Sequence, residues 1–230
     1  MVRRLVSIGL DALDSVLGNG LPPRSSNLII GPPGIGKEGI WYRFLDSGSN
    51  EGDACLSVSK QSTRDLLDDA KGFGVSVLDN VTWLDCSGVQ SENSLPGDLS
   101  KLTDLSINIK KFAADNKGKN IRVAFDILSP LLLLHPLETI YKFLGGLLAE
   151  LKNYETVFLA TIEEGMHATK DVVVFEQLFD GAIEMKLYEE GMKIIPLLRV
   201  KKMRGTPPQP TFFSFKFLPS GGMEINAYND

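Results

Sequence analysis

An eight-residue phosphate-binding pattern constrains this chain more than any other feature of its sequence. Residues 31–38 read Gly-Pro-Pro-Gly-Ile-Gly-Lys-Glu, which matches the pattern Gly-x-x-x-x-Gly-Lys-Ser/Thr at every position except the last. The glycines of such a loop let successive backbone N–H groups wrap phosphate oxygens, the lysine reaches the β- and γ-phosphates, and the closing hydroxyl binds Mg²⁺. Glu38 puts a carboxylate in place of that hydroxyl. The pattern therefore predicts a nucleotide site, and Glu38 at its last position argues against hydrolysis of the bound nucleotide.

The segments on either side of this pattern favour a phosphate loop over a plain Pro/Gly turn that joins a strand to a helix. Asn27 to Ile30 is an apolar run typical of a buried strand, and Lys37 to Asp46 carries apolar residues at helical spacing. The amino end of that helix adds its partial positive charge to the backbone N–H groups. We expect ATP or ADP to be the ligand. The residues predicted to line its phosphates are Gly31, Pro32, Pro33, Gly34, Ile35, Gly36, Lys37, Glu38 and Gly39.

Length and charge limit the classes of protein to which the chain can belong. With 230 residues, 43% of them hydrophobic and 23% charged, it is long enough for one sizeable core, and we expect residues 1–230 to form a single domain. The formal net charge of −5 argues against a protein that holds nucleic acid through its overall field, although a local basic patch stays open. The amino terminus has no long apolar stretch, so a cytoplasmic location is expected. Cys55 and Cys86 are expected to be buried free thiols.

Strand-like runs alternate with helical patterns along most of the chain, which predicts a parallel sheet covered by helices on both faces. The last third differs, because its strands are joined by tight turns such as Glu190-Gly191. The predicted fold class is therefore α/β, with a mostly parallel central sheet and an antiparallel edge formed by the C-terminal strands. The expected strands are 27–30, 54–58, 81–84, 121–125, 156–161, 182–188, 192–200, 212–218 and 223–225. The expected helices are 37–46, 99–114, 137–151 and one from an N-cap at Ser62 to Gly72 or Gly74, with a loop at 90–97.

An aspartate at the end of an apolar strand is the second nucleotide motif. In phosphate-loop proteins such an aspartate holds Mg²⁺ directly or through water. Asp126 ends the run Ile121 to Phe125, and many strands end in Asp, so the pattern has weight only because a phosphate loop precedes it. We expect Asp126 to be the metal residue. Arg122 interrupts the apolar run, and we expect it to lie at the start of the strand with its guanidinium group in solvent.

These motifs and several others resemble the KaiC-like branch of the RecA-superfamily ATPases over nearly the whole chain. The matching blocks are Gly9 to Asp14, Leu17 to Pro22, Asp126 to Ser129, Phe179 to Ile183 and Lys202 to Thr206. The resemblance implies a RecA-like P-loop fold, bound nucleotide, and a homo- or hetero-oligomer built through RecA-type interfaces. It also implies that Lys202 and Arg204 reach across a subunit boundary to a neighbour's γ-phosphate. A solvated basic strand end is the alternative for these two residues.

Two departures from the family bear on hydrolysis. Relatives that hydrolyse ATP carry a Glu-Glu pair just after the second strand, one of which activates the attacking water, and the matching residues here are Lys60 and Gln61. Neither side chain can accept a proton as a carboxylate does. Glu38 also weakens the case for Mg²⁺, which remains a possible cofactor. Losing a general base costs about 10²–10⁴ in rate, so we expect little or no hydrolysis.

No catalytic residue is assigned, and the candidates are Asp126, Glu163 and Glu164. The two glutamates follow the strand 156–161 and could replace the missing base, although a solvated loop is the expectation we favour for them. His135 and His167 have no metal-site spacing with other ligands, so neither is expected to bind a metal.

Two further segments bear on partners. Leu131 to Leu134 is too short to span a membrane and is expected to pack in the core. Residues 162–170 correspond to a DNA-binding loop of recombinases but offer only His167 and Lys170 as phosphate contacts. Nucleic acid is therefore a weakly supported partner.

Three functions follow from these observations. The favoured one is a KaiC-like ATP-binding protein that is regulatory or serves as a non-catalytic partner subunit. The alternative is an active ATPase, either a RecA-type recombinase paralogue in DNA repair and recombination or an accessory motor component, in which Glu38 swings away or contacts Mg²⁺ itself. The third is a scaffold that has lost its nucleotide and keeps only the RecA-type interface.

Overall fold

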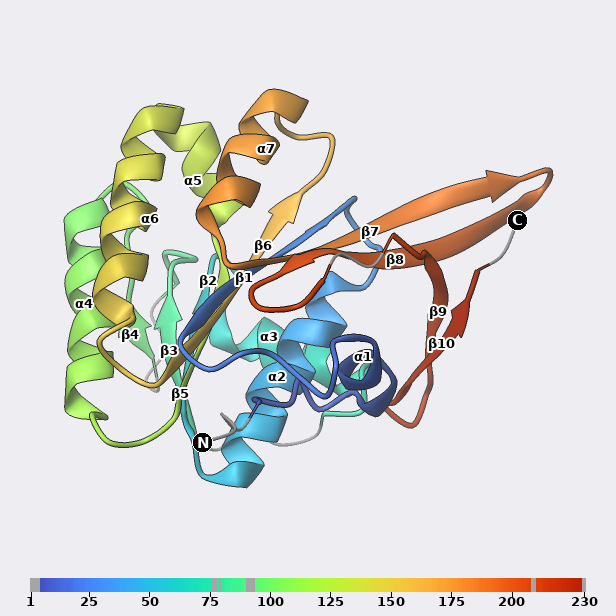
Figure 1. Cartoon of the computed structure of the whole chain (residues 1–230). Helices are drawn as coiled ribbons and strands as arrows, with labels where there is room; N and C mark the ends of the chain where they lie inside the picture. The colour runs from blue at the N-terminus through green and yellow to red at the C-terminus, as the bar shows by residue number, and fades with distance from the viewer. Residues whose placement is uncertain (1–4, 76–77, 79, 90–93, 208–209, 229–230) are drawn as a thin grey trace.

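A single mixed sheet organises the computed structural model, which describes residues 5–75, 78, 80–89, 94–207 and 210–228. Within these residues the sheet has ten strands in the order β10-β9-β8-β7-β1-β6-β5-β2-β3-β4 (Figure 1). The strands from β7 to β4 in this order run parallel to one another, and β8, β9 and β10 add antiparallel pairs at one edge. The parallel strands are β1 (Ser25–Gly31), β2 (Ala54–Ser59), β3 (Val81–Asp85), β4 (Leu95–Pro96), β5 (Ile121–Asp126), β6 (Thr156–Glu163) and β7 (Gly181–Glu190). The antiparallel ones are β8 (Lys193–Met203), β9 (Phe213–Phe217) and β10 (Met223–Ala227). The predicted fold class is confirmed.

Helices cover both faces of this sheet. Three lie on one face, α1 (Asp11–Val16), α2 (Lys37–Glu51) and α3 (Thr63–Lys71). Four lie on the other, α4 (Leu102–Asp115), α5 (Leu128–Leu134), α6 (Leu137–Leu151) and α7 (Thr169–Leu178) (Figure 1). The buried apolar residues accordingly fall into two clusters, one under each helical layer. Because every parallel strand ends at the same edge of the sheet, the loops after β1, β2, β5 and β6 converge there.

Most predicted elements are present, and four unpredicted ones are added. α3 begins after the Ser62 cap, whose hydroxyl accepts from the backbone N–H of Asp65, and α6 has the predicted bounds. The prediction of a loop over 90–97 is wrong for Leu95 and Pro96, which pair with β3 as the short strand β4. Residues 90–93 of that predicted loop lie outside the described residues. Three helices were not predicted, α1, α5 and α7. α7 is rich in β-branched valines, which have weak helix propensity, and packs through Val172 and Phe175, so tertiary contacts stabilise it.

The expectation for Arg122 is wrong, since its side chain is fully buried. Its Nε donates to Oδ2 of Asp53 at 2.7 Å, and its Nη1 donates to the carbonyl oxygens of Ser7 and Phe44. The reason is the position of β5, which lies between β6 and β2 and is covered by helices on both faces. The start of a central strand is not a surface position, and burial of the guanidinium group there requires the buried carboxylate as its partner.

The four leucines are split rather than uniformly buried. They form the end of α5, in which Leu131 is fully buried while Leu133 and Leu134 are 64% and 60% exposed. The prediction of core packing therefore holds for Leu131 and fails for the last two leucines. A helix turns about 100° per residue, so a run of consecutive apolar residues cannot all face the sheet. Cys55 and Cys86 are buried and unpaired, as predicted.

Candidate functional site

The predicted phosphate loop connects β1 to α2 at the carboxyl edge of the sheet. Gly34 and Gly36 have φ angles of 75° and 96°, a left-handed backbone that glycine adopts without the steric cost of a Cβ atom. Gly36 is also the N-cap of α2, so the first turn of that helix directs its unpaired N–H groups toward the loop. The geometry matches the anion-binding turn that the pattern predicts.

Lys37 is held inside this loop and is only 1% exposed. Its Nζ donates to the carbonyl oxygens of Gly31 at 3.0 Å and Pro32 at 2.8 Å, and to Oε2 of Glu163 at 2.9 Å. Glu163 is the register partner of Gly31 across β1 and β6, which explains why it reaches the lysine. The expectation that both glutamates lie in a solvated loop is wrong for Glu163, whereas Glu164 is exposed as expected.

Asp126 ends β5 beside this lysine. The hydroxyl of Thr161, near the end of the neighbouring strand β6, donates to Oδ1 of Asp126. Burial raises the pKa of Asp126 to about 6; the negative charges of Glu38 and Glu163 add to the rise, and the Thr161 hydrogen bond opposes it. A carboxylate that is costly to ionise alone is stabilised by a cation, so Asp126 is suited to a position next to a metal ion or a lysine.

The charges of Glu38 and Glu163 thus act on Asp126, and of these three carboxyl groups Glu163 is the one that pairs with Lys37. The field of Glu38 and Asp126 also reaches Tyr42, one turn after Glu38 on α2, whose pKa is raised mainly by burial and further by Asp69. Its hydroxyl is buried and has no hydrogen-bond partner among the described residues. The phenol therefore stays protonated at neutral pH and is available only as an uncharged donor or acceptor.

The residues that replace the family's glutamate pair lie next to Asp126. Ser59, the last residue of β2, is the register partner of Asp126 on β5, and Lys60 and Gln61 follow directly. Lys60 is exposed, and the side-chain amide of Gln61 donates to Asp69 at 3.3 Å. Positions 60 and 61 therefore follow the strand end beside Asp126, and neither carries a carboxylate.

Lys202 and Arg204 are not part of this cluster. They lie at the end of β8 that pairs with the start of β7, and Arg204 donates to the carbonyl oxygens of Pro23 and Arg24, just before β1 begins. The phosphate loop follows the other end of β1, about 20 Å away at the rise of an extended strand. Arg204 also pairs with Asp180 at 3.4 Å. Neither side chain can reach a nucleotide in the loop of its own chain.

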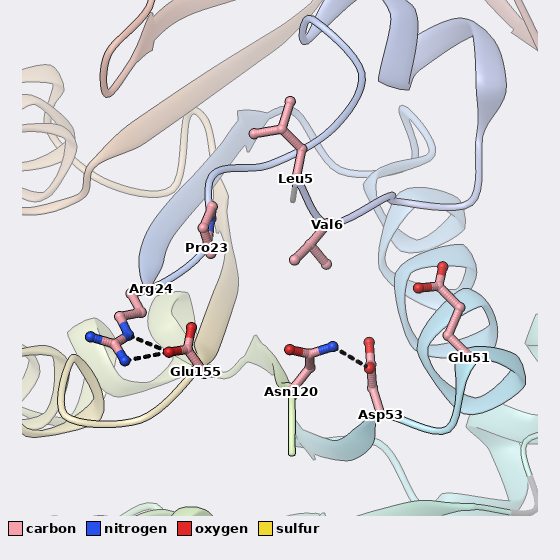
Figure 2. Close-up of a pocket in the computed structure, with 8 residues that line it drawn as sticks. All are labelled: Leu5, Val6, Pro23, Arg24, Glu51, Asp53, Asn120 and Glu155. Atoms are coloured by element: carbon pink, nitrogen blue, oxygen red, sulfur yellow. Dashed lines mark hydrogen bonds and ion pairs between the residues drawn. The ribbon is translucent and has the colours of Figure 1, made fainter. Parts of the chain in front are cut away.

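A hollow of about 320 Å³ lies at this opposite, amino edge of the sheet (Figure 2). Its polar groups already have partners, since Arg24 pairs with Glu155 and the side-chain amide of Asn120 donates to Asp53. Figure 2 shows Glu51, at the end of α2, across the hollow from the Arg24–Glu155 pair. Because these charges are matched within the chain, the hollow gives no indication of a ligand.

Metal-binding residues are few. In the described part of the chain, no group of three or more His, Cys, Asp or Glu side chains is arranged to hold a metal ion. His135 contacts the carbonyl oxygen of Leu99 through Nε2 at 2.7 Å, and His167 lies in the loop after β6. A cation bound with a polyphosphate needs only one or two protein carboxylates, because phosphate oxygens and water supply the other ligands. Asp126 and the Thr161 hydroxyl fit that smaller role.

Sequence reasoning did not find the two hydroxyl residues that support this site. Thr161 donates to Asp126, and Oγ of Ser129 accepts from the backbone N–H of Glu163 at 2.8 Å. Thr161 lies at the carboxyl end of a strand next to Asp126, so strand order would have revealed it. Ser129 lies in the block Asp126 to Ser129 that carries the family resemblance, which is the signal that could have pointed to it.

Comparisons with known proteins agree with the resemblance that the sequence motifs carry. A family model described as the KaiC ATPase matches residues 6–229. A UPF0273 protein of Methanopyrus kandleri is 27% identical over 226 residues, with 90% of this chain and 86% of that protein covered. The circadian clock protein KaiC3 of Synechocystis is 28% identical over 211 residues, which cover 87% of this chain but only 39% of the clock protein.

Solved structures give the same fold. The crystal structure of a KaiC-like protein from the archaeon Pyrococcus horikoshii superposes with a TM-score of 0.81 at 23% identity, covering 98% of this chain and 99% of that one. At this identity the likeness establishes the fold alone. Across the described residues, no helix is long and apolar enough to cross a membrane.

Proposed function

Because this chain belongs to the KaiC ATPase family, a membership that implies nucleotide binding and suggests oligomerisation, we propose that it binds ATP or ADP and hydrolyses little or none of it. In this role it is a regulatory protein or a non-catalytic partner subunit. The ligands of the phosphates are the backbone N–H groups of residues 34–39, the first that follow Pro33, and the amine of Lys37. The single observation that supports binding most strongly is the position of Lys37. It is buried at the amino end of α2, and its amine contacts the carbonyl oxygens of Gly31 and Pro32 in the phosphate loop.

Two observations support weak hydrolysis. Glu38 stands where the Mg²⁺ hydroxyl belongs, and its charge acts on Asp126 together with that of Glu163. Lys60 and Gln61 stand beside Asp126 where a general base belongs. When bound, Mg²⁺ would shield the polyphosphate charge; Asp126 would place it, with the Thr161 hydroxyl holding the carboxylate. The carboxyl group of Glu163 is the nearest replacement base, but in this structure it neutralises Lys37.

The subunit roles follow from the two edges of the sheet. Lys202 and Arg204 would contact the nucleotide of a neighbouring subunit, since they lie at the edge opposite their own phosphate loop. All ten described strands belong to one sheet, which supports a single nucleotide-binding domain over residues 1–230. The matching family model is that of KaiC and one matched relative is a circadian clock protein, so the recombinase alternative is not favoured.

Calorimetric titration with ATP, at several Mg²⁺ concentrations, tests this proposal. We expect saturable binding by the natural chain and at least about hundredfold weaker binding by Lys37→Ala, because each charge-assisted hydrogen bond contributes about 1.5–3 kcal/mol. Lys111→Ala, an exposed lysine on α4, is the matched control and should bind as the natural chain does. Failure of the natural chain to bind ATP or ADP would leave only the scaffold function.

Phosphate release tests the second half of the proposal. We expect no release above that of Lys37→Ala from the natural chain. The triple variant Glu38→Thr, Lys60→Glu, Gln61→Glu restores the hydroxyl and the carboxylate pair and should gain about 10²-fold or more in rate, the typical contribution of a general base. Release by the natural chain at the rate of the triple variant would show that Glu38 and Lys60-Gln61 do not limit hydrolysis.

A further inference from the structure

Three aromatic side chains form a row along the first turns of α2, which we call the aromatic row. Tyr42 lies on α2, Phe73 follows α3, and Phe217 ends β9. The ring centroids are 5.8 Å apart for Tyr42 and Phe73 and 5.2 Å apart for Phe73 and Phe217, the latter pair in an edge-to-face arrangement. Phe73 and Phe217 are only partly buried. The row therefore joins three segments that are distant in the sequence at one place beside the phosphate loop.

Glycines in the loop let these rings approach its backbone. A Cβ atom at Gly36 would lie 2.7 Å from the ring of Phe217, and one at Gly39 would lie 2.4 Å from Phe73 and 2.7 Å from Phe217. A side chain at either position would force the rings to shift. The rings thus lie directly against the last residue of the phosphate loop before Lys37 and against the first turn of α2.

Strand order places Phe217 of the aromatic row on a defined side of the loop. Asp126 and Glu163 are on β5 and β6, which follow β1 in one direction along the sheet, whereas Phe217 is on β9, in the other direction. The lysine and the aspartate mark the side of the β- and γ-phosphates and of the metal. The base and the γ-phosphate are at opposite ends of a nucleotide, so an extended nucleotide with its γ-phosphate on the β5–β6 side directs its ribose and base toward the side of β9.

We propose that Phe217, supported from behind by Phe73, forms the wall against which the base of the bound nucleotide packs. This inference rests on the proposed nucleotide binding and adds the subsite for the base, a role that the family motifs do not include. Every nucleobase has an apolar π-face, and stacking on an aromatic ring tolerates base identity. The wall therefore favours a nucleoside triphosphate over a bare polyphosphate and discriminates weakly between purines.

A purely structural role for Phe217 is the competing explanation, because the ring also packs against the hydrophobic cluster under α2. The two explanations differ in what they predict for inorganic tripolyphosphate, which occupies the phosphate loop but has no base. A base-contacting ring matters for ATP alone. A ring that only shapes the loop matters equally for both ligands.

Calorimetric titrations of ATP, GTP and tripolyphosphate into the natural chain and four variants test the proposal. We expect Phe217→Ala to weaken ATP and GTP about tenfold to hundredfold, the range for loss of one base–aromatic stack. Its affinity for tripolyphosphate should stay within about twofold. Phe217→Leu, which keeps an apolar side chain, should lose part of the ATP affinity, and Phe217→Tyr, which keeps the ring, should retain most of it. Phe213→Ala, at the other end of β9, is the matched control and should bind all three ligands normally.

Each outcome is decisive. If Phe217→Leu, with native circular dichroism, loses ATP and tripolyphosphate affinity equally, or loses neither, the wall is refuted while nucleotide binding stands. If the natural chain binds tripolyphosphate and ATP with equal affinity, the base contributes nothing and the wall is likewise refuted. If the natural chain binds neither ligand, the proposed function fails and the base subsite fails with it.

Discussion

The two edges of the sheet each bury one basic side chain, and the two cations are held in opposite ways. Lys37, at the carboxyl edge, contacts two carbonyl oxygens and Glu163, which is 23% exposed. Arg122, at the amino edge, contacts the buried Asp53, which is 5% exposed, and carbonyl oxygens from two other segments. It also pairs at the longer distance of 3.4 Å with Glu51, which is 37% exposed. Both cations are 1% exposed, so burial alone does not distinguish them.

The difference lies in the partners. Glu163 can turn to solvent when Lys37 moves to a phosphate, because a partly exposed carboxylate recovers hydration. Asp53 has no such alternative, and a buried carboxylate left without its cation is strongly destabilising. The side chain of Arg122 is also tightly enclosed by α2, since a Cβ atom at Gly48 would lie 2.4 Å from Cδ of Arg122. The Lys37–Glu163 ion pair can therefore separate when a ligand binds, and we call it the releasable pair. The Arg122–Asp53 ion pair stabilises the fold and cannot separate without a large cost, and we call it the locked pair.

Replacing Arg122 and Lys37 in turn by methionine tests this comparison with the largest expected effect. We expect Arg122→Met to lower the free energy of unfolding by about 3–5 kcal/mol, because it leaves the buried carboxylate of Asp53 without its cation, and the uncharged Asn120 amide does not replace that cation. Lys37→Met should lower it by no more than about 1 kcal/mol, since Glu163 regains water. Urea unfolding followed by circular dichroism measures both values, with Arg64→Met, an exposed arginine on α3, as the neutral control. Equal losses for the two variants would contradict the distinction between a locked and a releasable pair.

The pH dependence of stability tests the charges at the carboxyl edge. The pKa of Asp126 is raised from 3.8 to about 6 in the folded protein, chiefly by burial, so between these values the folded chain binds a proton that the unfolded chain has lost. The free energy of unfolding should therefore decrease as the pH rises from about 4 to about 6, by about 1–2 kcal/mol, and change little from this group above that range.

Urea unfolding of the natural chain and of Asp126→Asn, with chelator present and no nucleotide, isolates this contribution. The variant should lack this part of the decrease, while Asp104→Asn, at an exposed position on α4, should keep it. An identical pH profile for the natural chain and Asp126→Asn would refute the raised pKa.

Neutralising the carboxylate on Lys37 is the smallest expected change and sharpens the comparison further. Glu163→Gln removes a negative charge beside the phosphates and weakens the contact that holds Lys37, so ATP affinity should rise about five- to tenfold, or about 1 kcal/mol. Calorimetry measures it. Glu164→Gln is the matched control, because the neighbouring carboxylate is exposed and makes no contact with the lysine, and its affinity should not change. A fall in affinity for Glu163→Gln would instead assign Glu163 a direct role in binding the nucleotide.

Local patterns in the sequence were sufficient for the elements that depend on neighbouring residues. The glycine spacing of residues 31–38 predicted the loop, and the apolar run before Asp126 predicted β5 and the position of that aspartate. The periodicity of 137–151 predicted α6 with its bounds. Each of these features rests on backbone conformation or side-chain period over a few residues, which is information that a sequence carries directly.

Tertiary structure alone decided which distant residues meet. Strand order put Glu163 on Lys37, Thr161 on Asp126 and Asp53 on Arg122, reversing the expectations of a solvated glutamate and a solvated arginine. The same order left Lys202 and Arg204 at the edge opposite the phosphate loop and brought Phe217 against it. The physical reason is that burial and charge pairing depend on the neighbours supplied by other strands and helices, and the order β10-β9-β8-β7-β1-β6-β5-β2-β3-β4 is not a local property of any segment.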